Sequence, residues 1–195
     1  MAGPKVVVYG LSTEGYAIAS QMAIKGADVY IIDESTPSAI SLKAEIAKTY
    51  PNVSSLKEDE PLLAMEPIDV AISKAQYLFF TPRIRKTGQD IKTEIHSKFK
   101  DAVTSLKKNS SVIFTLATGF GGNNENISLL EHVTGLQAGK NISYFYYPLE
   151  DLNQQPKIIG SFNGKEDLVL SDLLTTSKKE KKFVAISSSE HFHAI

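Results

Sequence analysis

The 195-residue sequence predicts an α/β fold in which a mostly parallel sheet is covered by helices on both faces. Short apolar runs typical of buried strands alternate along the chain with longer segments whose apolar residues recur at helical spacing. The strand runs are nearly continuous in apolar residues, as expected of strands that are buried on both faces. No repeat or linker-like segment divides the chain, so we expect residues 1–195 to form one domain.

The first half of the chain begins with an expected strand at residues 5–9, which runs into a glycine-containing turn. Residues 13–25 carry a helical stripe of apolar side chains, and Gly26 ends that helix because glycine tolerates the left-handed conformation. A second buried strand is expected at residues 27–32. Residues 37–50 begin with a proline and are expected to form a second helix.

The remainder continues the alternation less regularly. Residues 51–67 are polar and contain three prolines, including Pro61 and Pro67, which indicates a weak strand, a loop and part of a helix. We expect later strands at residues 77–80, 111–116, 142–147, 157–159 and 183–186. We expect later helices at residues 89–107, 123–133 and 166–176. Residues 187–195 show no clear pattern and are expected to form a disordered tail.

Composition excludes several classes of function. The formal net charge is −1, so we expect no nucleic-acid partner and no membrane partner. The sequence contains no cysteine, which excludes disulfides, thiolate metal sites and cysteine nucleophiles, and we expect no metal site. No apolar run approaches the roughly 18 residues of a transmembrane helix, and no charged segment of the kind that begins a secretion signal precedes the first strand. We therefore expect a cytoplasmic location.

A glycine-rich turn follows the first expected strand. The segment Gly10-Leu11-Ser12-Thr13-Glu14-Gly15 matches the dinucleotide fingerprint G-x-G-x-x-G of Rossmann-type domains except at its second glycine. That second position normally lacks a side chain because the backbone there approaches the pyrophosphate, whereas this chain has Ser12. Its hydroxyl could donate to a phosphate, or the side chain could crowd it. The candidates for holding a pyrophosphate at the helix N-terminus are Gly10, Leu11, Ser12, Thr13 and Gly15.

An acidic residue stands at the end of the second expected strand. Asp33 lies at the distance from Gly15 at which the fingerprint places a carboxylate that accepts hydrogen bonds from ribose hydroxyls. Glu34 takes this role if the strand ends one residue later. A carboxylate there repels a 2′-phosphate, so we expect NAD to be preferred over NADP. The alternative is a Rossmann-like scaffold whose turn glycines are purely structural.

The second half adds four weaker motifs. Residues 111–122 read S-V-I-F-T-L-A-T-G-F-G-G, and residues 131–139 read E-H-V-T-G-L-Q-A-G. Residues 144–148 read Y-F-Y-Y-P, and residues 156–160 read P-K-I-I-G. In order and spacing these resemble S-T-V-x-P-G-T, E-x-x-S-G-L-K-x-G, Y-S-P-E-R and P-R-x-x-G of the UDP-sugar 6-dehydrogenases. The resemblance is to their N-terminal NAD-binding domain and covers roughly residues 4–190.

This resemblance implies oxidation of a sugar 6-alcohol by two hydride transfers to NAD, through a cysteine-bound thioester. It implies that Thr118 helps to hold the cofactor and an active-site water, and that Thr81 and Pro82 lie beside the nicotinamide half. The sequence also departs from the family. Leu149 stands where the family has the glutamate of Y-S-P-E, with Glu150 one place later, and the family's catalytic cysteine belongs to domains that this sequence does not contain.

We therefore expect a nucleotide-binding domain that is catalytically incomplete by itself. It would form a homo-oligomer or bind a separate partner chain, because the family's first domain packs on a middle domain. One alternative is a small NAD-dependent oxidoreductase that is complete as a homodimer. Another is a scaffold without nucleotide binding, which the changes at Ser12 and Leu149 favour. The candidate catalytic residues are Thr118 and Glu150.

Overall fold

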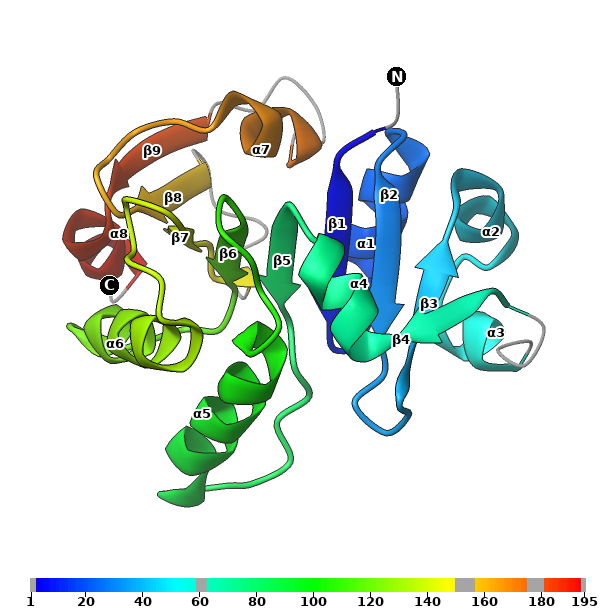
Figure 1. The fold of residues 1–195 in the computed structure, drawn as a ribbon, viewed down its shortest axis with the longest axis horizontal. Coiled ribbons are helices and arrows are strands. Elements are labelled where there is room, and N and C mark those ends of the chain that lie inside the picture. Colours follow the sequence, from blue (N-terminus) through cyan, green and yellow to red (C-terminus); the bar gives the residue numbers. More distant parts are fainter. Residues whose placement is uncertain (1–2, 59–62, 150–156, 175–180, 194–195) are drawn as a thin grey trace.

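The computed structural model describes residues 3–58, 63–149, 157–174 and 181–193. In these residues a single sheet carries helices on both faces, which confirms the predicted Rossmann-type α/β fold (Figure 1). The strands are β1 (Lys5–Tyr9), β2 (Asp28–Ile32), β3 (Ser38–Leu42), β4 (Met65–Pro67), β5 (Tyr77–Phe80), β6 (Ser111–Phe114), β7 (Ser143–Tyr146), β8 (Lys157–Ser161) and β9 (Lys181–Ala185). The helices are α1 (Thr13–Ile24), α2 (Ala44–Thr49), α3 (Val53–Glu58), α4 (Ile68–Lys74), α5 (Asp90–Val103), α6 (Gly122–Thr134), α7 (Leu168–Leu173) and α8 (Ile186–His193).

The order of the strands determines where a ligand can bind. The sheet has the order β4-β3-β2-β1-β5-β6-β7-β8-β9, and its central strands from β2 to β7 are parallel. The next strands outward, β3 and β8, are antiparallel to their inner neighbours. The chain passes from β1 to β2 on one side and later returns to β5 on the other side of β1. In sheets of this kind ligands bind outside the carboxyl ends of the strands where the order reverses, which here is between β1 and β5.

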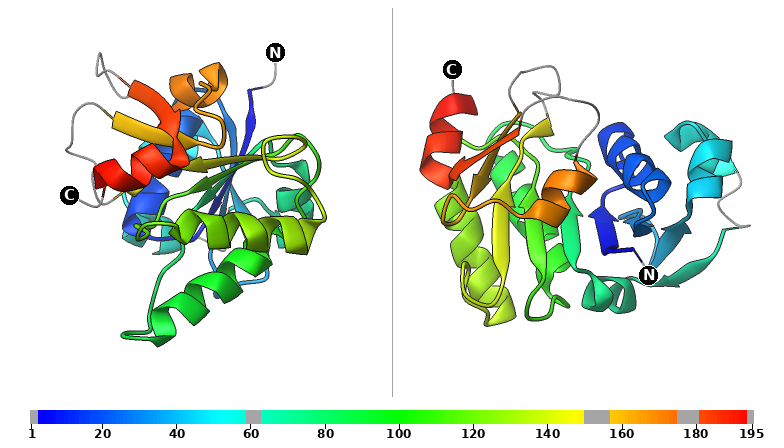
Figure 2. Two further views of the ribbon diagram at one scale, coloured as in Figure 1. Left: turned by 90° about the vertical axis from the view of Figure 1, so that its left-hand side faces the viewer. Right: turned by 90° about the horizontal axis from the view of Figure 1, so that it is seen from above.

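Alternate side chains of the strands build two cores, one on each face of the sheet. On one face Val6 and Val8 of β1 belong to a core shared with α1, α2, α3 and α7. On the other face Val7 and Tyr9 belong to a core shared with α4, α5, α6 and α8. In its right-hand view, Figure 2 shows α1 and α2 on one side of the sheet and α4 and α6 on the other. Burial on both faces explains why the strand sequences are apolar runs rather than alternating patterns.

An aromatic cluster anchors α5 to the sheet. The ring of Phe99 on α5 packs edge-on against Phe80 of β5 at a centroid distance of 5.0 Å and against Phe114 of β6 at 5.4 Å. All three side chains are buried. The cluster therefore holds α5 over the neighbouring strands β5 and β6.

The expected helix at residues 37–50 is wrong in its first half. Ser38–Leu42 forms β3, which pairs antiparallel with β2 so that Ile31 lies opposite Ile40. A turn in which the Thr36 N–H donates to the Asp33 carbonyl at 3.0 Å reverses the chain and brings these apolar runs together. Helix begins only at Ala44. The proline at the start of this segment precedes a strand, and pairing with β2 overrides local helical preference.

Two further helices differ from the sequence-based expectation. Residues 68–74, for which we expected no regular element, form α4 and bury Ala71 and Ile72. The expected disordered tail is wrong over its described part, because Ile186–His193 forms α8 and buries Ser189 and Glu190. Its polar sequence hides a helix that is held by buried polar contacts rather than by an apolar stripe. Among the described helices, none is long and apolar enough to cross a membrane.

The aromatic cluster predicts a large stability effect for one substitution. Phe99→Ala removes a buried ring between two strands, and we expect it to lower the free energy of unfolding by about 3–5 kcal/mol. Lys100→Ala changes the exposed next residue of the same helix and should alter it by less than about 0.5 kcal/mol. Urea denaturation of both variants measures the difference, and equal stabilities would contradict the assigned packing of α5.

Candidate nucleotide-binding site

A cleft of about 510 Å³ lies at the carboxyl ends of β1 and β5, where the strand order reverses. The start of α1, the loop after β5 and the segment after β6 form its walls. Residues that line it include Ser12, Glu14, Thr81, Pro82, Arg83 and Leu149. The fold thus brings together the glycine turn, the Thr81–Pro82 segment and Leu149, which are far apart in the sequence.

The glycine turn passes very close to the backbone after β5. Gly10 has φ +119°, and a Cβ there would lie 2.0 Å from the Thr81 carbonyl oxygen. A Cβ at Gly15 would lie 2.4 Å from the Gly10 carbonyl oxygen. The buried hydroxyl of Thr81 donates to the carbonyl oxygens of Tyr9 and Gly10, each at 3.2 Å. Both glycines are therefore required by close packing, and Thr81 fixes the turn rather than offering its hydroxyl to a ligand.

Ser12 serves as the N-cap of α1. Its Oγ accepts the Gly15 N–H at 3.0 Å and donates a long 3.4 Å hydrogen bond to the Thr81 carbonyl. The hydroxyl is thus engaged within the protein, and one of the first amides of the helix already has an acceptor. Thr13 begins the helix, and Glu14 places a carboxylate in its first turn and in the lining of the cleft. The turn itself consequently offers less to an anion than an all-glycine fingerprint does.

The two candidate carboxylates after β2 have different tasks. Asp33 is buried, and its Oδ1 accepts the N–H of Ser35 at 3.0 Å and the hydroxyl of Ser35 at 2.7 Å. Glu34 accepts the backbone N–H of Arg83 at 3.1 Å and pairs with the Lys98 ammonium at 2.5 Å. Because Glu34 is neutralised by Lys98 and holds the loop after β5, Asp33 is the better candidate for a ribose hydroxyl.

An ionic cluster that the sequence reading missed holds the loop after β5. The carboxylate of Glu94 on α5 accepts the N–H groups of Arg85 and Lys86, the latter at 2.7 Å. Lys98, one turn further along α5, bridges Glu94 at 3.1 Å and Glu34. The Lys86 N–H, followed by Lys98, lowers the pKa of Glu94 below its ordinary value. The Glu94–Lys98 spacing is typical of an ion pair on one face of a helix. Nothing in the sequence indicated that Glu94 also binds the backbone of the loop after β5.

Tyr9, which directly precedes the glycine turn, keeps its phenol protonated at neutral pH. Tyr9 precedes Gly10 and is buried, and its ring stacks on Phe80 at 5.8 Å. Burial, followed by the charges of Glu34 and Asp101, raises the pKa of Tyr9 to about 12. It remains protonated and does not serve as a general base there.

Thr118 lies in a buried polar network rather than in the cleft. Its Oγ1 accepts from the Asn123 side chain at 2.9 Å, and its N–H donates to the Tyr146 hydroxyl at 3.1 Å. The carboxylate of Glu190 on α8 accepts the N–H groups of Gly121 and Asn123, each at 3.0 Å, and the Asn123 amide at 2.8 Å. Glu190 thereby caps the N-terminus of α6, which places α8 beside α6 in Figure 1.

Thr118 instead lines a neighbouring hollow of about 740 Å³ between α5 and α6. Apolar side chains around it include Ile91 and the exposed Phe120. On the cleft side, Leu149 is buried, and its N–H donates to the Thr115 carbonyl at 3.0 Å. Leucine cannot transfer a proton, so the position that carries a glutamate in the dehydrogenase motif provides no acid or base here. The second catalytic candidate, Glu150, lies outside the described residues.

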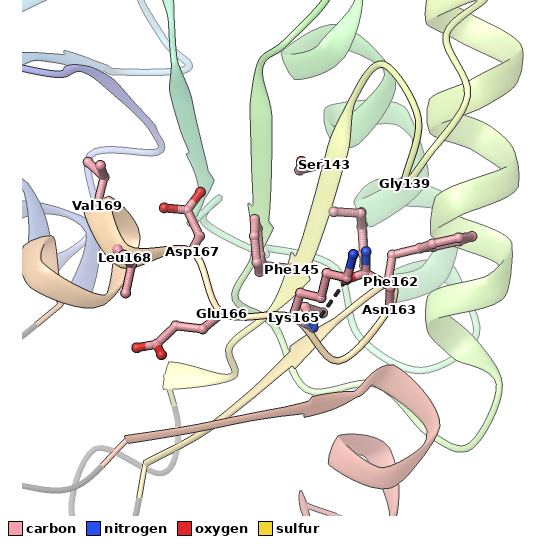
Figure 3. A pocket seen from close by; sticks show the side chains of 12 residues that line it. Gly139, Ser143, Phe145, Phe162, Asn163, Lys165, Glu166, Asp167, Leu168 and Val169 are labelled. Atoms are coloured by element: carbon pink, nitrogen blue, oxygen red, sulfur yellow. Dashed lines mark hydrogen bonds between the residues drawn. The ribbon is translucent and has the colours of Figure 1, made fainter.

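Figure 3 shows a different hollow, of about 380 Å³, at the opposite edge of the sheet. Its carboxylate Asp167 is used within the protein, because it accepts the Leu170 N–H at 2.9 Å and the Tyr77 hydroxyl at 3.0 Å. Burial, followed by Asp167, raises the pKa of Tyr77. Leu168 and Val169 nearby are exposed. These groups explain how α7 begins, and they do not converge on a ligand.

Comparison with solved structures finds this fold among dehydrogenases. An NDP-N-acetyl-D-galactosaminuronic acid dehydrogenase from Methanosarcina mazei Go1 is 13% identical, with a TM-score of 0.68 over 97% of this chain and 46% of that chain. A UDP-D-ManNAc dehydrogenase from Pyrococcus horikoshii is 18% identical, with a TM-score of 0.68 over 96% of this chain and 48% of that chain. The chain thus spans about half the length of either protein.

A reductive aminase from Aspergillus terreus, in complex with NADPH and ethyl levulinate, is 12% identical, with a TM-score of 0.55 over 98% of this chain and 60% of that chain. No model of a known protein family matches the sequence, and no curated protein sequence matches it. At these identities the similarity shows the fold. The resemblance to the NAD-binding domain of UDP-sugar dehydrogenases is confirmed at that level.

The cap on α6 predicts a measurable contribution to stability. Glu190→Ala removes the carboxylate that accepts from the Gly121 N–H and from both the N–H and the side-chain amide of buried Asn123. We expect a loss of about 2–4 kcal/mol of unfolding free energy. Glu125→Ala is the control, because Glu125 is on the same helix but about half exposed, and its ion pair with exposed Lys92 contributes little to stability. If denaturant titration finds the two variants equally stable, Glu190 does not anchor α6.

Proposed function

We propose that this chain binds NAD in the cleft between β1 and β5. The observation that carries the proposal is the close approach of the glycine turn to the Thr81–Pro82 segment at the point where the strand order reverses, with Asp33 at the end of the neighbouring strand. The glycine turn, the Thr81–Pro82 segment and Asp33 come from three separate parts of the sequence. Their convergence at one edge supports a dinucleotide site more strongly than the glycine motif does alone.

The assignment of roles follows from the contacts. The start of α1 and the backbone of Gly10, Leu11 and Thr13 would face the pyrophosphate, and Asp33 would accept from the adenosine ribose. Thr81 would act indirectly, because its hydroxyl fixes the glycine turn instead of contacting the ligand. Pro82 contributes to the cleft wall. A carboxylate at Asp33 disfavours a 2′-phosphate, which supports NAD over NADP. When bound, the nicotinamide would exchange a hydride with a substrate.

We propose further that the chain does not complete a dehydrogenase reaction by itself. It has no cysteine for a thioester, and Leu149 replaces the acidic residue that the dehydrogenase motif carries. Exposed apolar side chains near the site support association with a partner chain or a second copy that supplies these groups. Phe120 is 68% exposed beside the hollow that Thr118 lines, and Ile91 is 36% exposed on its rim.

A second candidate is a scaffold that has lost nucleotide binding. It is favoured by the engagement of the Ser12 hydroxyl and by the Arg83 side chain, which donates to the Leu11 carbonyl across the glycine turn. Both features engage, within the protein, polar groups at the turn that a pyrophosphate would otherwise meet. Titration distinguishes this candidate from the first, because a scaffold would not saturate with any adenine nucleotide.

The experiment is calorimetric titration of the wild-type protein with NAD⁺, NADH and NADP⁺. We expect NAD⁺ to bind, NADP⁺ to bind more weakly, and Asp33→Ala to weaken NAD⁺ by roughly 10- to 100-fold, as the loss of charged hydrogen bonds predicts. Asp28→Ala is the matched control at the opposite end of β2, where the carboxylate pairs with exposed Lys43. It should leave affinity unchanged. Absence of binding up to millimolar nucleotide would establish the scaffold instead.

A further inference from the structure

We propose that Arg83 is the side chain of this site that binds the pyrophosphate. Its positive charge would replace the hydrogen-bonding groups that the glycine turn no longer offers to a phosphate. The inference rests on the proposed nucleotide site and identifies the residue that recognises the diphosphate group of its ligand. Neither the fingerprint nor the sequence resemblance points to this residue. It is carried by the geometry of the loop after β5.

The first step concerns what the turn lacks. Ser12 Oγ already accepts the Gly15 N–H and donates to the Thr81 carbonyl, so neither group is available to a phosphate in this arrangement. Glu14 adds a negative charge to the lining of the cleft. A diphosphate brings two further negative charges. A positively charged side chain at the turn is therefore needed for favourable binding.

The second step concerns where such a side chain lies. Arg83 and Arg85 are the cationic residues among the cleft lining, and Arg83 is the one whose guanidinium reaches the glycine turn, where Nη2 donates to the Leu11 carbonyl. That carbonyl is next to Ser12, the position at which the fingerprint brings backbone against the pyrophosphate. The guanidinium thus already borders the space that the diphosphate would enter.

The third step concerns how firmly Arg83 is held. Its N–H donates to Glu34 at 3.1 Å, and its carbonyl accepts from the Lys98 ammonium. Its side chain is partly buried against the cleft. Anchoring the backbone at both polar groups reduces the conformational freedom lost when a ligand binds.

The fourth step concerns the capacity left on the side chain. A guanidinium has five N–H donors in a planar fork. Within the described residues, the guanidinium of Arg83 forms a single hydrogen bond, to the Leu11 carbonyl. No described carboxylate forms an ion pair with it. The other donors can meet two phosphate oxygens in the bidentate arrangement that arginine favours. Lysine would supply the charge without that geometry.

The test combines substitutions with a series of shortened ligands. Wild type, Arg83→Met, Arg83→Lys and Lys86→Met are titrated with adenosine, AMP, ADP-ribose and NAD⁺. Lys86→Met is the matched control, because Lys86 is exposed in the same loop and lies outside the cleft lining. Far-ultraviolet circular dichroism and the melting temperature verify that each variant is folded.

We expect Arg83→Met to weaken ADP-ribose and NAD⁺ by about 10- to 100-fold, the range of one charge-assisted hydrogen-bonding group. Adenosine, which has no phosphate, should change by less than about twofold. Arg83→Lys should fall between wild type and Arg83→Met, and Lys86→Met should match wild type. Raising the salt concentration should lower the affinity for ADP-ribose less in Arg83→Met than in wild type, because the variant lacks one ionic contact with the ligand.

Three results would overturn the proposal. Equal weakening of adenosine and ADP-ribose by Arg83→Met would mean that the residue only shapes the turn through Leu11. Unchanged ADP-ribose affinity would mean that the diphosphate lies elsewhere, with the nucleotide site itself left standing. If the wild-type protein binds none of the four ligands, both the nucleotide site and the role of Arg83 are overturned. This result differs from the other two, which concern the role of Arg83 alone.

Discussion

The contact between the Gly10 turn and the backbone of Thr81 is the constraint on which the carboxyl edge of the sheet depends. β1 and β5 are hydrogen-bonded neighbours whose chains diverge there, one into α1 and the other into a loop. They pass so closely that any side chain at Gly10 would collide with the Thr81 carbonyl. Thr81 then closes the contact, because its N–H and its hydroxyl both donate to the Tyr9 carbonyl. A change at this contact would move the helix start, the loop and the cleft together.

Carboxylates from distant parts of the chain hold the loops at this edge. Loop N–H groups beyond the strand ends have no partner in the sheet and must find acceptors elsewhere. Glu34 accepts from Arg83, Glu94 accepts from Arg85 and Lys86, and Glu190 accepts from the loop before α6. These bonds have an ionised acceptor and are stronger than neutral ones. The loops therefore have defined positions without regular secondary structure, as a site built for ligand recognition requires.

Sequence reasoning predicted the parts of the molecule that depend on local patterns. The apolar runs, the helix after the glycine turn and the acidic end of β2 follow from periodicity and from a fingerprint with a physical cause. It failed for β3, whose short apolar run becomes a strand only because β2 lies beside it. It also failed for α8, whose contribution comes from buried Glu190 rather than from apolar periodicity.

The site follows the same division. Gly10, Gly15 and Asp33 could be chosen as candidates from spacing, because each position has a backbone or strand-end requirement. Arg83, Lys98 and Glu94 could not, because their roles depend on the path of a loop and on a helix that crosses it. Thr118 was chosen by resemblance alone. The structure places it in the lining of the hollow between α5 and α6 and not in the lining of the cleft.

The two departures from the dehydrogenase pattern have opposite consequences for function. The serine at the second glycine position uses its hydroxyl to cap α1, yet a partly buried arginine stands beside the same turn and can restore attraction for an anion. The leucine at the position of the family's glutamate cannot transfer a proton, and two titratable groups close to the turn do not replace that glutamate. Glu34 is paired with Lys98, and Tyr9 keeps its proton up to a pKa of about 12. Among the described residues, Arg83 is thus a candidate replacement for the attraction lost at the turn, whereas neither Glu34 nor Tyr9 replaces the glutamate. That asymmetry is expected if selection has maintained a nucleotide site whose chemistry is completed by groups from another chain.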